Sequence, residues 1–214
     1  MNRKEIAKKA TELLEYEYPD AACSLTYEKP YELLIAVRLS AQCTDARVNL
    51  VTPALFGRYQ SLQALAGASY EEIEELVKSC GFFRTKAHDI VELSKMLIAD
   101  YDSVVPSTME ELLKLPGVGR KTANLVLGDV YGIPAVVCDT HCIRITNLLG
   151  LSTSKNPLKT EKELRECLPL DKASDFCHRL VLHGRAVCVA RKPKCDLCVL
   201  NGICAHVLEM AKPL

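Results

Sequence analysis

The feature that most restricts the fold of this chain is a group of four cysteines between residues 188 and 204. Cys188, Cys195, Cys198 and Cys204 are spaced C-x6-C-x2-C-x5-C, so their thiolates would surround one metal centre within a single loop. Four cysteine ligands suit either zinc or an iron–sulfur cluster. Zinc modules commonly use two C-x2-C pairs, and this chain has one, so the wider spacing favours the iron–sulfur cluster. Four unrelated buried cysteines are the alternative.

The composition of the chain indicates the redox state of its cysteines. The chain has 214 residues, 11 cysteines and a net charge of zero. Its first residues are charged and amphipathic, and no apolar run reaches the roughly 18 residues of a membrane span. We therefore expect a cytoplasmic protein with no membrane partner, with reduced thiols and no disulfides. Most of the cysteines outside the motif are predicted to be small core residues.

Helix-type periodicity dominates the chain. Apolar residues occupy almost every position of 31–43, as in a buried central helix. Ser107 and Glu110 have the spacing of a capping box, which predicts that a helix begins there. No stretch alternates like a strand, and residues 134–139 are too few to build a sheet. The fold class predicted from these patterns is all-α.

A glycine-rich stretch, LPGVGRKTA (115–123), separates two of the predicted helices. Its spacing matches neither a P-loop nor a dinucleotide-binding fingerprint. What remains is a tight hairpin whose second helix offers backbone N–H groups at its start, where an anion binds. Gly117 and Gly119 would permit positive φ angles and the close approach of a phosphate, with Arg120 beside them. A plain helix–helix turn is the alternative.

A second basic segment surrounds the first cysteine of the motif. Arg191, Lys192 and Lys194 follow Cys188, Arg185 precedes it, and no acidic residue occurs between positions 183 and 195. We expect these cations to contact phosphates from a loop that the metal shapes. A solvated basic loop is the alternative.

The hairpin and the cysteine motif do not stand alone. GIPAVVCDTHCIRI, which contains Asp139, RLSAQCTDARVN (38–49) and SCGFFRTKAHDI (79–90) are also present. Together these motifs resemble the endonuclease III family of helix-hairpin-helix DNA glycosylases, and the similarity covers nearly the whole chain. The resemblance implies a [4Fe-4S] cluster and a bifunctional glycosylase and AP lyase of base excision repair. Its substrate would be oxidised pyrimidines in duplex DNA.

The resemblance also implies a domain organisation. Two helical domains would flank a DNA-binding cleft: a six-helix domain at 22–132, and a cluster domain formed by 1–21 and 133–214. The partner would be duplex DNA with damaged bases or abasic sites. We expect a monomer associated with the nucleoid.

Two residues would carry the chemistry. In the family pattern Lys121 attacks C1′ of the damaged nucleoside and forms a Schiff base, after which β-elimination nicks the strand. Attack needs a neutral amine, whose ordinary pKa is about 10.4; Arg120, the helix start and partial burial would lower it. Asp139 would support the positive charge that develops on the sugar and assist proton transfer. The alternatives are a surface lysine and a helix N-cap, and His141 is either a DNA contact or a structural histidine.

Removing a base requires its extrusion from the stack, which leaves a gap. The resemblance places Gln42 and Phe82 at the positions that fill this gap, although Phe82 could equally be a core residue. It also places Ser40 and Asp45 in the pocket that receives the base. Arg185 and Lys192 would then contact the DNA backbone.

The same residues bear on four other functions. An adenine-mismatch glycosylase of the same fold lacks the nucleophilic lysine, so Lys121 opposes it. A related glycosylase with another base choice, such as mismatched thymine or uracil, stays open. A non-catalytic iron–sulfur DNA-binding protein would not need both Lys121 and Asp139, and a zinc-binding adaptor would contain no iron.

Overall fold

The structure, a computed structural model, describes residues 1–210 and contains no strand among them. The all-α prediction is therefore confirmed. The chain divides into two compact units: residues 23–132, and residues 1–22 together with the chain from Ile133 onward. Every helix in the described part is too short or too polar to cross a membrane.

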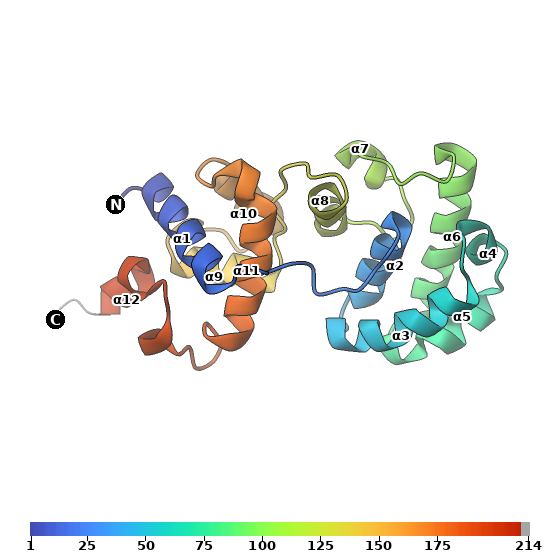
Figure 1. Cartoon of the computed structure of the whole chain (residues 1–214), viewed down its shortest axis with the longest axis horizontal. Helices are drawn as coiled ribbons and strands as arrows, with labels where there is room; N and C mark the ends of the chain where they lie inside the picture. Colours follow the sequence, from blue (N-terminus) through green and yellow to red (C-terminus); the bar gives the residue numbers. More distant parts are fainter. Residues whose placement is uncertain (211–214) are drawn as a thin grey trace. The chain divides into compact units, whose positions relative to one another are not determined.

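The unit 23–132 is built around one buried helix. Residues 31–37 and Leu39 of α2 are buried, whereas Arg38 and Ser40 are half-buried and Pro30 is exposed. The predicted central helix is therefore present. Figure 1 shows α2 among the other helices of this unit, and α3, α6 and α8 contact it. The elements are α2 (Pro30–Ser40), α3 (Asp45–Arg58), α4 (Leu62–Ala66), α5 (Tyr70–Val77), the 3-10 helix η1 (Lys78–Cys80), α6 (Phe83–Tyr101), α7 (Met109–Leu112) and α8 (Arg120–Asp129).

Side-chain caps begin several of these helices, and one differs from the prediction. The Ser69 hydroxyl accepts a hydrogen bond from the Glu72 N–H at the start of α5. Helix α7, however, is capped by Thr108, whose hydroxyl accepts from Glu111 N–H. The predicted cap at Ser107 is wrong by one residue. Both Ser107 and Thr108 have a glutamate three residues later, so the sequence offers two capping frames.

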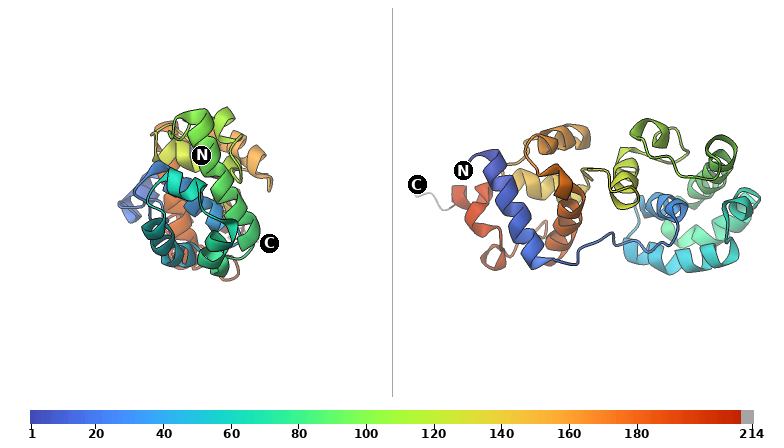
Figure 2. Two further views of the ribbon diagram at one scale, coloured as in Figure 1. Left: turned by 90° about the vertical axis from the view of Figure 1, so that its right-hand side faces the viewer. Right: turned by 45° about the horizontal axis from the view of Figure 1, so that its top comes forward.

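The second unit joins the first helix of the chain to the C-terminal half. Helix α1 lies beside α11 (Figure 2), and their contact buries Ala7, Ala10 and Leu14 of α1. Residues 134–139 form no strand and run as an extended connection into α9. The elements are α1 (Arg3–Glu17), α9 (Thr140–Leu148), α10 (Pro157–Arg165), η2 (Leu170–Lys172), α11 (Ala173–Ala186), η3 (Cys195–Leu197), η4 (Asn201–Ile203) and α12 (Ala205–Met210).

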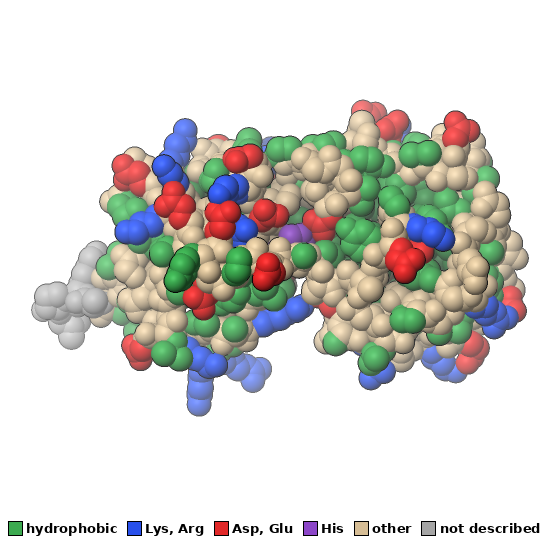
Figure 3. Space-filling model, in the orientation of Figure 1, with side chains coloured by type: hydrophobic (Ala, Val, Ile, Leu, Met, Phe, Trp, Pro, Cys, Tyr) green, Lys and Arg blue, Asp and Glu red, His purple; other side chains and the backbone are tan. Residues whose placement is uncertain are grey.

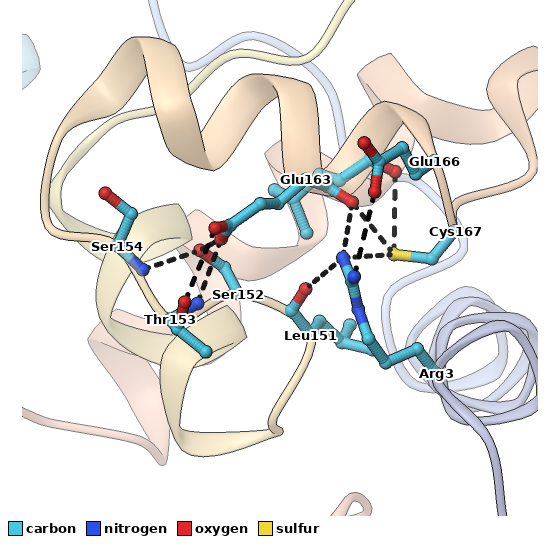
Figure 4. A network of polar contacts seen from close by, with 9 residues as sticks. Arg3, Leu151, Ser152, Thr153, Ser154, Glu163, Glu166 and Cys167 are labelled. Atoms are coloured by element: carbon cyan, nitrogen blue, oxygen red, sulfur yellow. Dashed lines mark hydrogen bonds and ion pairs between the residues drawn. The ribbon is translucent and has the colours of Figure 1, made fainter.

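Polar contacts secure α1 within this unit (Figure 4). The Arg3 guanidinium donates to the carbonyl oxygens of Leu151 at 3.0 Å and Glu163 at 2.7 Å. Glu163 in turn accepts from the Ser152 hydroxyl at 2.6 Å. The side chain of Lys172 reaches Glu15 at 2.5 Å. These bonds explain why the first residues of the chain fold with residues that follow Ile133.

The structure records no disulfide among residues 1–210, which contain all 11 cysteines. Outside the motif, Cys23 and Cys43 are half-buried rather than core residues. Burial raises the pKa of Cys23 to about 12, so it is a neutral thiol at physiological pH. The remaining cysteines outside the motif lie in the core as predicted: Cys80, Cys138, Cys142, Cys167 and Cys177.

Candidate functional site

The turn between α7 and α8 forms the predicted hairpin. Gly117 has a φ of +72°, and the Val118 N–H donates to the Leu115 carbonyl at 3.1 Å to close the turn. Gly119 is the N-cap residue of α8, so no side chain caps the first turn of this helix. Backbone N–H groups at a helix start without a side-chain cap bind anions. The start of α8 therefore has the geometry that anion binding at a helix N-terminus requires.

Both the positive φ angle and the lack of space for a side chain require glycine at position 117. A Cβ at this position would lie 2.7 Å from Arg38 Cδ and 2.8 Å from Asp89 Oδ2. Arg38 of α2 and Asp89 of α6 form an ion pair of 2.6 Å, and the hairpin rests on it. Gly119 differs, because its φ is −102° and nothing lies within 4 Å of a Cβ there. The expectation that both glycines use positive φ is thus wrong for Gly119.

Alanine at each glycine should separate folding from DNA binding. Gly117→Ala adds backbone strain and a clash with the ion pair, and we expect a loss of about 2 kcal/mol of stability. Gly119→Ala should leave the thermal midpoint nearly unchanged and weaken DNA binding, because its Cβ occupies the space that a phosphate would approach. Thermal unfolding and fluorescence anisotropy with a duplex measure the two effects. Equal thermal midpoints for the two variants would contradict this account.

Lys121 is the second residue of α8 and is exposed, whereas the next two residues of the helix are buried. Partial burial of the Lys121 side chain was predicted to help activate its amine. Within the unit 23–132 this side chain is not buried. The other expected features are present, because Arg120 and the start of α8 lie directly beside Lys121.

Two exposed residues with left-handed backbone mark a second part of this unit. Gln42 follows α2 with a φ of +55°, and Phe82 caps α6 with a φ of +48°. Phe82 is 65% exposed, which excludes the core alternative. Non-glycine residues with positive φ are uncommon, and such strain persists only where the surroundings enforce it.

The two residues expected in a base pocket have partners of their own. Ser40, at the end of α2, is half-buried and donates its hydroxyl to the Val37 carbonyl at 2.9 Å. Asp45, the first residue of α3, accepts from the Ser24 hydroxyl at 2.6 Å.

Asp139 is the N-cap residue of α9. Its Oδ1 accepts from the Cys142 N–H at 2.7 Å, and the residue is half-buried. The predicted helix cap is therefore present, and it engages Oδ1 of the carboxylate. The His141 ring lies tightly against Gly184 of α11, where a Cβ would overlap it. Lys121 belongs to the unit 23–132, whereas Asp139 and His141 belong to the other unit.

The four motif cysteines line one pocket after α11. Each is half-buried, and Leu148, Val187 and Val207 form apolar parts of the same wall. Cys198 Sγ lies 3.3 Å from His183 Nε2, and the Tyr18 hydroxyl lies 3.2 Å from the other ring nitrogen of that histidine.

The chemistry of this pocket fits an iron–sulfur cluster. Four cysteine thiols line this one pocket together with apolar side chains, and cysteine thiolates are the ligands that hold such clusters.

The basic residues near the cysteines are accessible. Arg185, Arg191 and Lys192 are exposed, and Lys194 donates to the Ala186 carbonyl at 3.1 Å. Figure 3 shows Lys and Arg side chains projecting from the lower edge of the unit that contains α11. The side chains of Arg185, Arg191 and Lys192 therefore lie at the solvent-accessible surface.

Comparisons with known proteins match both motifs. Residues 35–170 match the family described as HhH-GPD superfamily base excision DNA repair protein, and residues 188–204 match the iron–sulfur binding domain of endonuclease III. Endonuclease III of Synechocystis sp. is 48% identical over 95% of this chain and 93% of its own. That of Bacillus subtilis is 45% identical over 87% and 86%. The chain belongs to the endonuclease III family.

Solved structures of endonuclease III agree with this assignment. A trapped endonuclease III–DNA covalent intermediate has a TM-score of 0.91 and 39% identity, covering 99% of this chain and 100% of that chain. A non-covalent endonuclease III–DNA complex has a TM-score of 0.90 and 40% identity, covering 98% of each. A thermostable thymine-DNA glycosylase, at 23% identity and a TM-score of 0.81, shows the same fold.

As a member of the endonuclease III family, this protein is a bifunctional DNA glycosylase and AP lyase of base excision repair. It binds DNA and carries a [4Fe-4S] cluster. The residues that fit this cluster are the four cysteines that line the pocket after α11: Cys188, Cys195, Cys198 and Cys204. When bound, the cluster would hold the loop that carries the basic residues.

Sequence reasoning missed several residues that support this endonuclease III site. Lys86 is fully buried in α6. Its position on the apolar face of the helix 83–101 was the sequence pattern that indicated this burial. His183 is buried beside Cys198, and its only signal was its place five residues before the first motif cysteine. The Arg38–Asp89 pair joins two helices far apart in sequence, so no local pattern indicated it.

Proposed function

We propose that this protein removes oxidised pyrimidines from duplex DNA with Lys121 as the nucleophile. The supporting observation is that Lys121 lies exposed in the first turn of α8, two residues after its glycine cap. The amine and the phosphate-binding amides therefore belong to one helix start. Holding both groups on one rigid element favours a reactive geometry.

The proposed reaction has two steps. The neutral Nζ of Lys121 attacks C1′, the bond from C1′ to the base breaks, and the base leaves with the electron pair and takes up a proton. Nζ then loses one proton, and the C1′–O4′ bond breaks as O4′ takes up a proton, which opens the sugar ring and yields the protonated Schiff base between C1′ and Nζ. Loss of a proton from C2′ then expels the 3′ phosphate and nicks the strand. Asp139 would support the positive charge on the sugar and assist these proton transfers.

Other residues would bind and open the duplex. Gln42 and Phe82 would enter the gap left by the extruded base, as their exposure and fixed backbone favour. Ser40 and Asp45 would line the base pocket. Gly117, Gly119, Arg120, Arg185 and Lys192 would contact the backbone, with His141 as a further contact.

The remaining proposals concern organisation. We assign the helix-hairpin-helix to a domain at 22–132 and the cluster to a domain formed by 1–21 and 133–214. The enzyme would act as a monomer on nucleoid DNA in the cytoplasm, since its substrate is chromosomal and one chain supplies every proposed site residue.

Borohydride trapping tests the proposed function. The protein is mixed with a duplex that contains thymine glycol, an abasic site or no damage, and the imine is reduced. We expect a covalent protein–DNA adduct with the first two duplexes and none with the third. An adduct with the abasic duplex alone would retain the lyase and reject oxidised pyrimidine as the lesion. No adduct with either duplex, from protein with its full iron content, would reject the lysine mechanism.

Asp139→Asn should distinguish the role of Asp139 as the N-cap of α9 from its proposed role in base removal. Asparagine caps helices about as well as aspartate, so we expect a stability change below about 0.5 kcal/mol. Loss of the negative charge should slow base removal by roughly 10²-fold. Thermal unfolding and single-turnover rates on a thymine glycol duplex measure the two effects. A variant with wild-type rates would show that Asp139 serves α9 alone.

A further inference from the structure

Lys86 is a charged residue with no exposed surface, in the second turn of α6. Its Nζ donates to three main-chain carbonyl oxygens: Leu39 at 2.9 Å, Ala41 at 2.8 Å and Cys80 at 2.8 Å. An ammonium group has three N–H donors, so the three acceptors match the charged form completely. Burial lowers the pKa of Lys86, and the neighbouring thiols of Cys43 and Cys80 act against this shift.

The three carbonyl groups belong to two segments that are far apart in the sequence. Leu39 and Ala41 end α2, and the next residue is Gln42. Cys80 ends η1, two residues before Phe82. One side chain therefore joins the backbone that precedes Gln42 to the backbone that precedes Phe82, which are two of the four non-glycine residues with positive φ among residues 1–210. A cation at the C-terminal end of α2 also suits the negative end of that helix.

We propose that Lys86 is a positioning residue that holds the segments of Gln42 and Phe82 in one geometry, so that both enter the duplex together. The inference rests on the proposed function, in which these two residues fill the gap left by the base. Lys86 itself is buried and does not touch DNA.

The physical reason is the work done during base extrusion. Unstacking a base costs a few kcal/mol, and the residues that enter the gap must resist that force. Segments with strained backbone relax when the contacts that enforce the strain are lost. Without Lys86, insertion would deform the protein before it displaced the base. An abasic site has no base to unstack, so nicking at such a site should depend far less on Lys86.

The test compares Lys86→Met with Lys95→Met. Methionine keeps an apolar stem and removes the three donors, and Lys95 is a half-exposed lysine of the same helix that pairs with Glu92. Single-turnover base removal from a thymine glycol duplex and nicking of an abasic duplex are measured for each. A 2-aminopurine opposite the lesion reports opening of the stack.

For Lys86→Met we expect base removal to slow by at least about tenfold, loss of the 2-aminopurine signal, and nicking within about threefold of wild type. Lys95→Met should match wild type in all three. Equal losses of base removal and nicking, or no loss of either, would overturn the proposal. If Lys86→Met does not fold, Lys86→Gln, which keeps two N–H donors, must show the same selective loss in a milder form.

The results that would reject the proposed function differ from those that would reject the role of Lys86. Wild-type protein that forms no borohydride adduct would reject the lysine mechanism and leave the Lys86 geometry open to direct measurement. Hydrogen exchange over 39–43 and 79–83 provides that measurement, since Lys86→Met should raise exchange in both segments together. A rise in neither segment would overturn the inference whatever the activity of the enzyme.

Discussion

Lys121→Ala is expected to abolish the borohydride-trapped adduct with both the thymine glycol and the abasic duplex. Alanine has no amine, so neither C1′ attack nor the Schiff base can occur. Base removal should fall by roughly 10⁴-fold or more, because the variant loses the bond-forming group rather than a supporting contact. Single-turnover kinetics and gel separation of the adduct measure both losses.

Stability and DNA binding should survive this change. Lys121 is exposed, and replacing an exposed helix residue by alanine changes stability by less than about 0.5 kcal/mol. Lys114→Ala is the matched control, since Lys114 is an exposed lysine that precedes the same hairpin. It should retain the adduct. An adduct of undiminished yield from Lys121→Ala would show that another amine is the nucleophile.

Replacing one cysteine of the motif has the second largest expected effect. Cys195→Ala removes one of the four proposed ligands, and we expect iron content and visible absorption to be lost together. Few side chains between 188 and 204 are buried, Leu200 and Ile203 among them, so the loop has little apolar packing of its own. Structural metal centres supply folding energy directly, and this loop should therefore unfold and become sensitive to proteases.

The control for this experiment is Cys167→Ala. Cys167 is a buried cysteine outside the motif, whose thiol lies 3.5 Å from the Glu163 carbonyl oxygen. Its replacement should keep full iron content and cost about 1 kcal/mol, the usual effect of removing a small buried group. Iron content that stays at wild-type level in Cys195→Ala would mean that this thiol is not a ligand.

The helices and the cysteine motif were readable from local patterns. Helix periodicity and caps depend on residues three or four positions apart, and the all-α class followed from them. The same locality explains the error at Ser107, because two overlapping capping frames have equal local support and Thr108 is the cap observed.

The location of the hairpin could be predicted from the sequence, but the backbone angles of its glycines could not. The sequence indicates a turn wherever glycines separate two helical patterns. Which glycine needs positive φ depends on what lies underneath, and the Arg38–Asp89 pair beneath Gly117 comes from two other helices. The exposure of Phe82 depended in the same way on its place between η1 and α6.

Residues close in sequence therefore revealed the helix class, the cysteine spacing and the family motifs, because each is a pattern within a few turns of chain. Contacts between distant segments required the folded chain. Lys86 shows the difference most clearly: its three carbonyl partners lie 47, 45 and 6 residues away. A lysine becomes a buried link between two segments only when folding brings three unpaired carbonyl groups around its ammonium group.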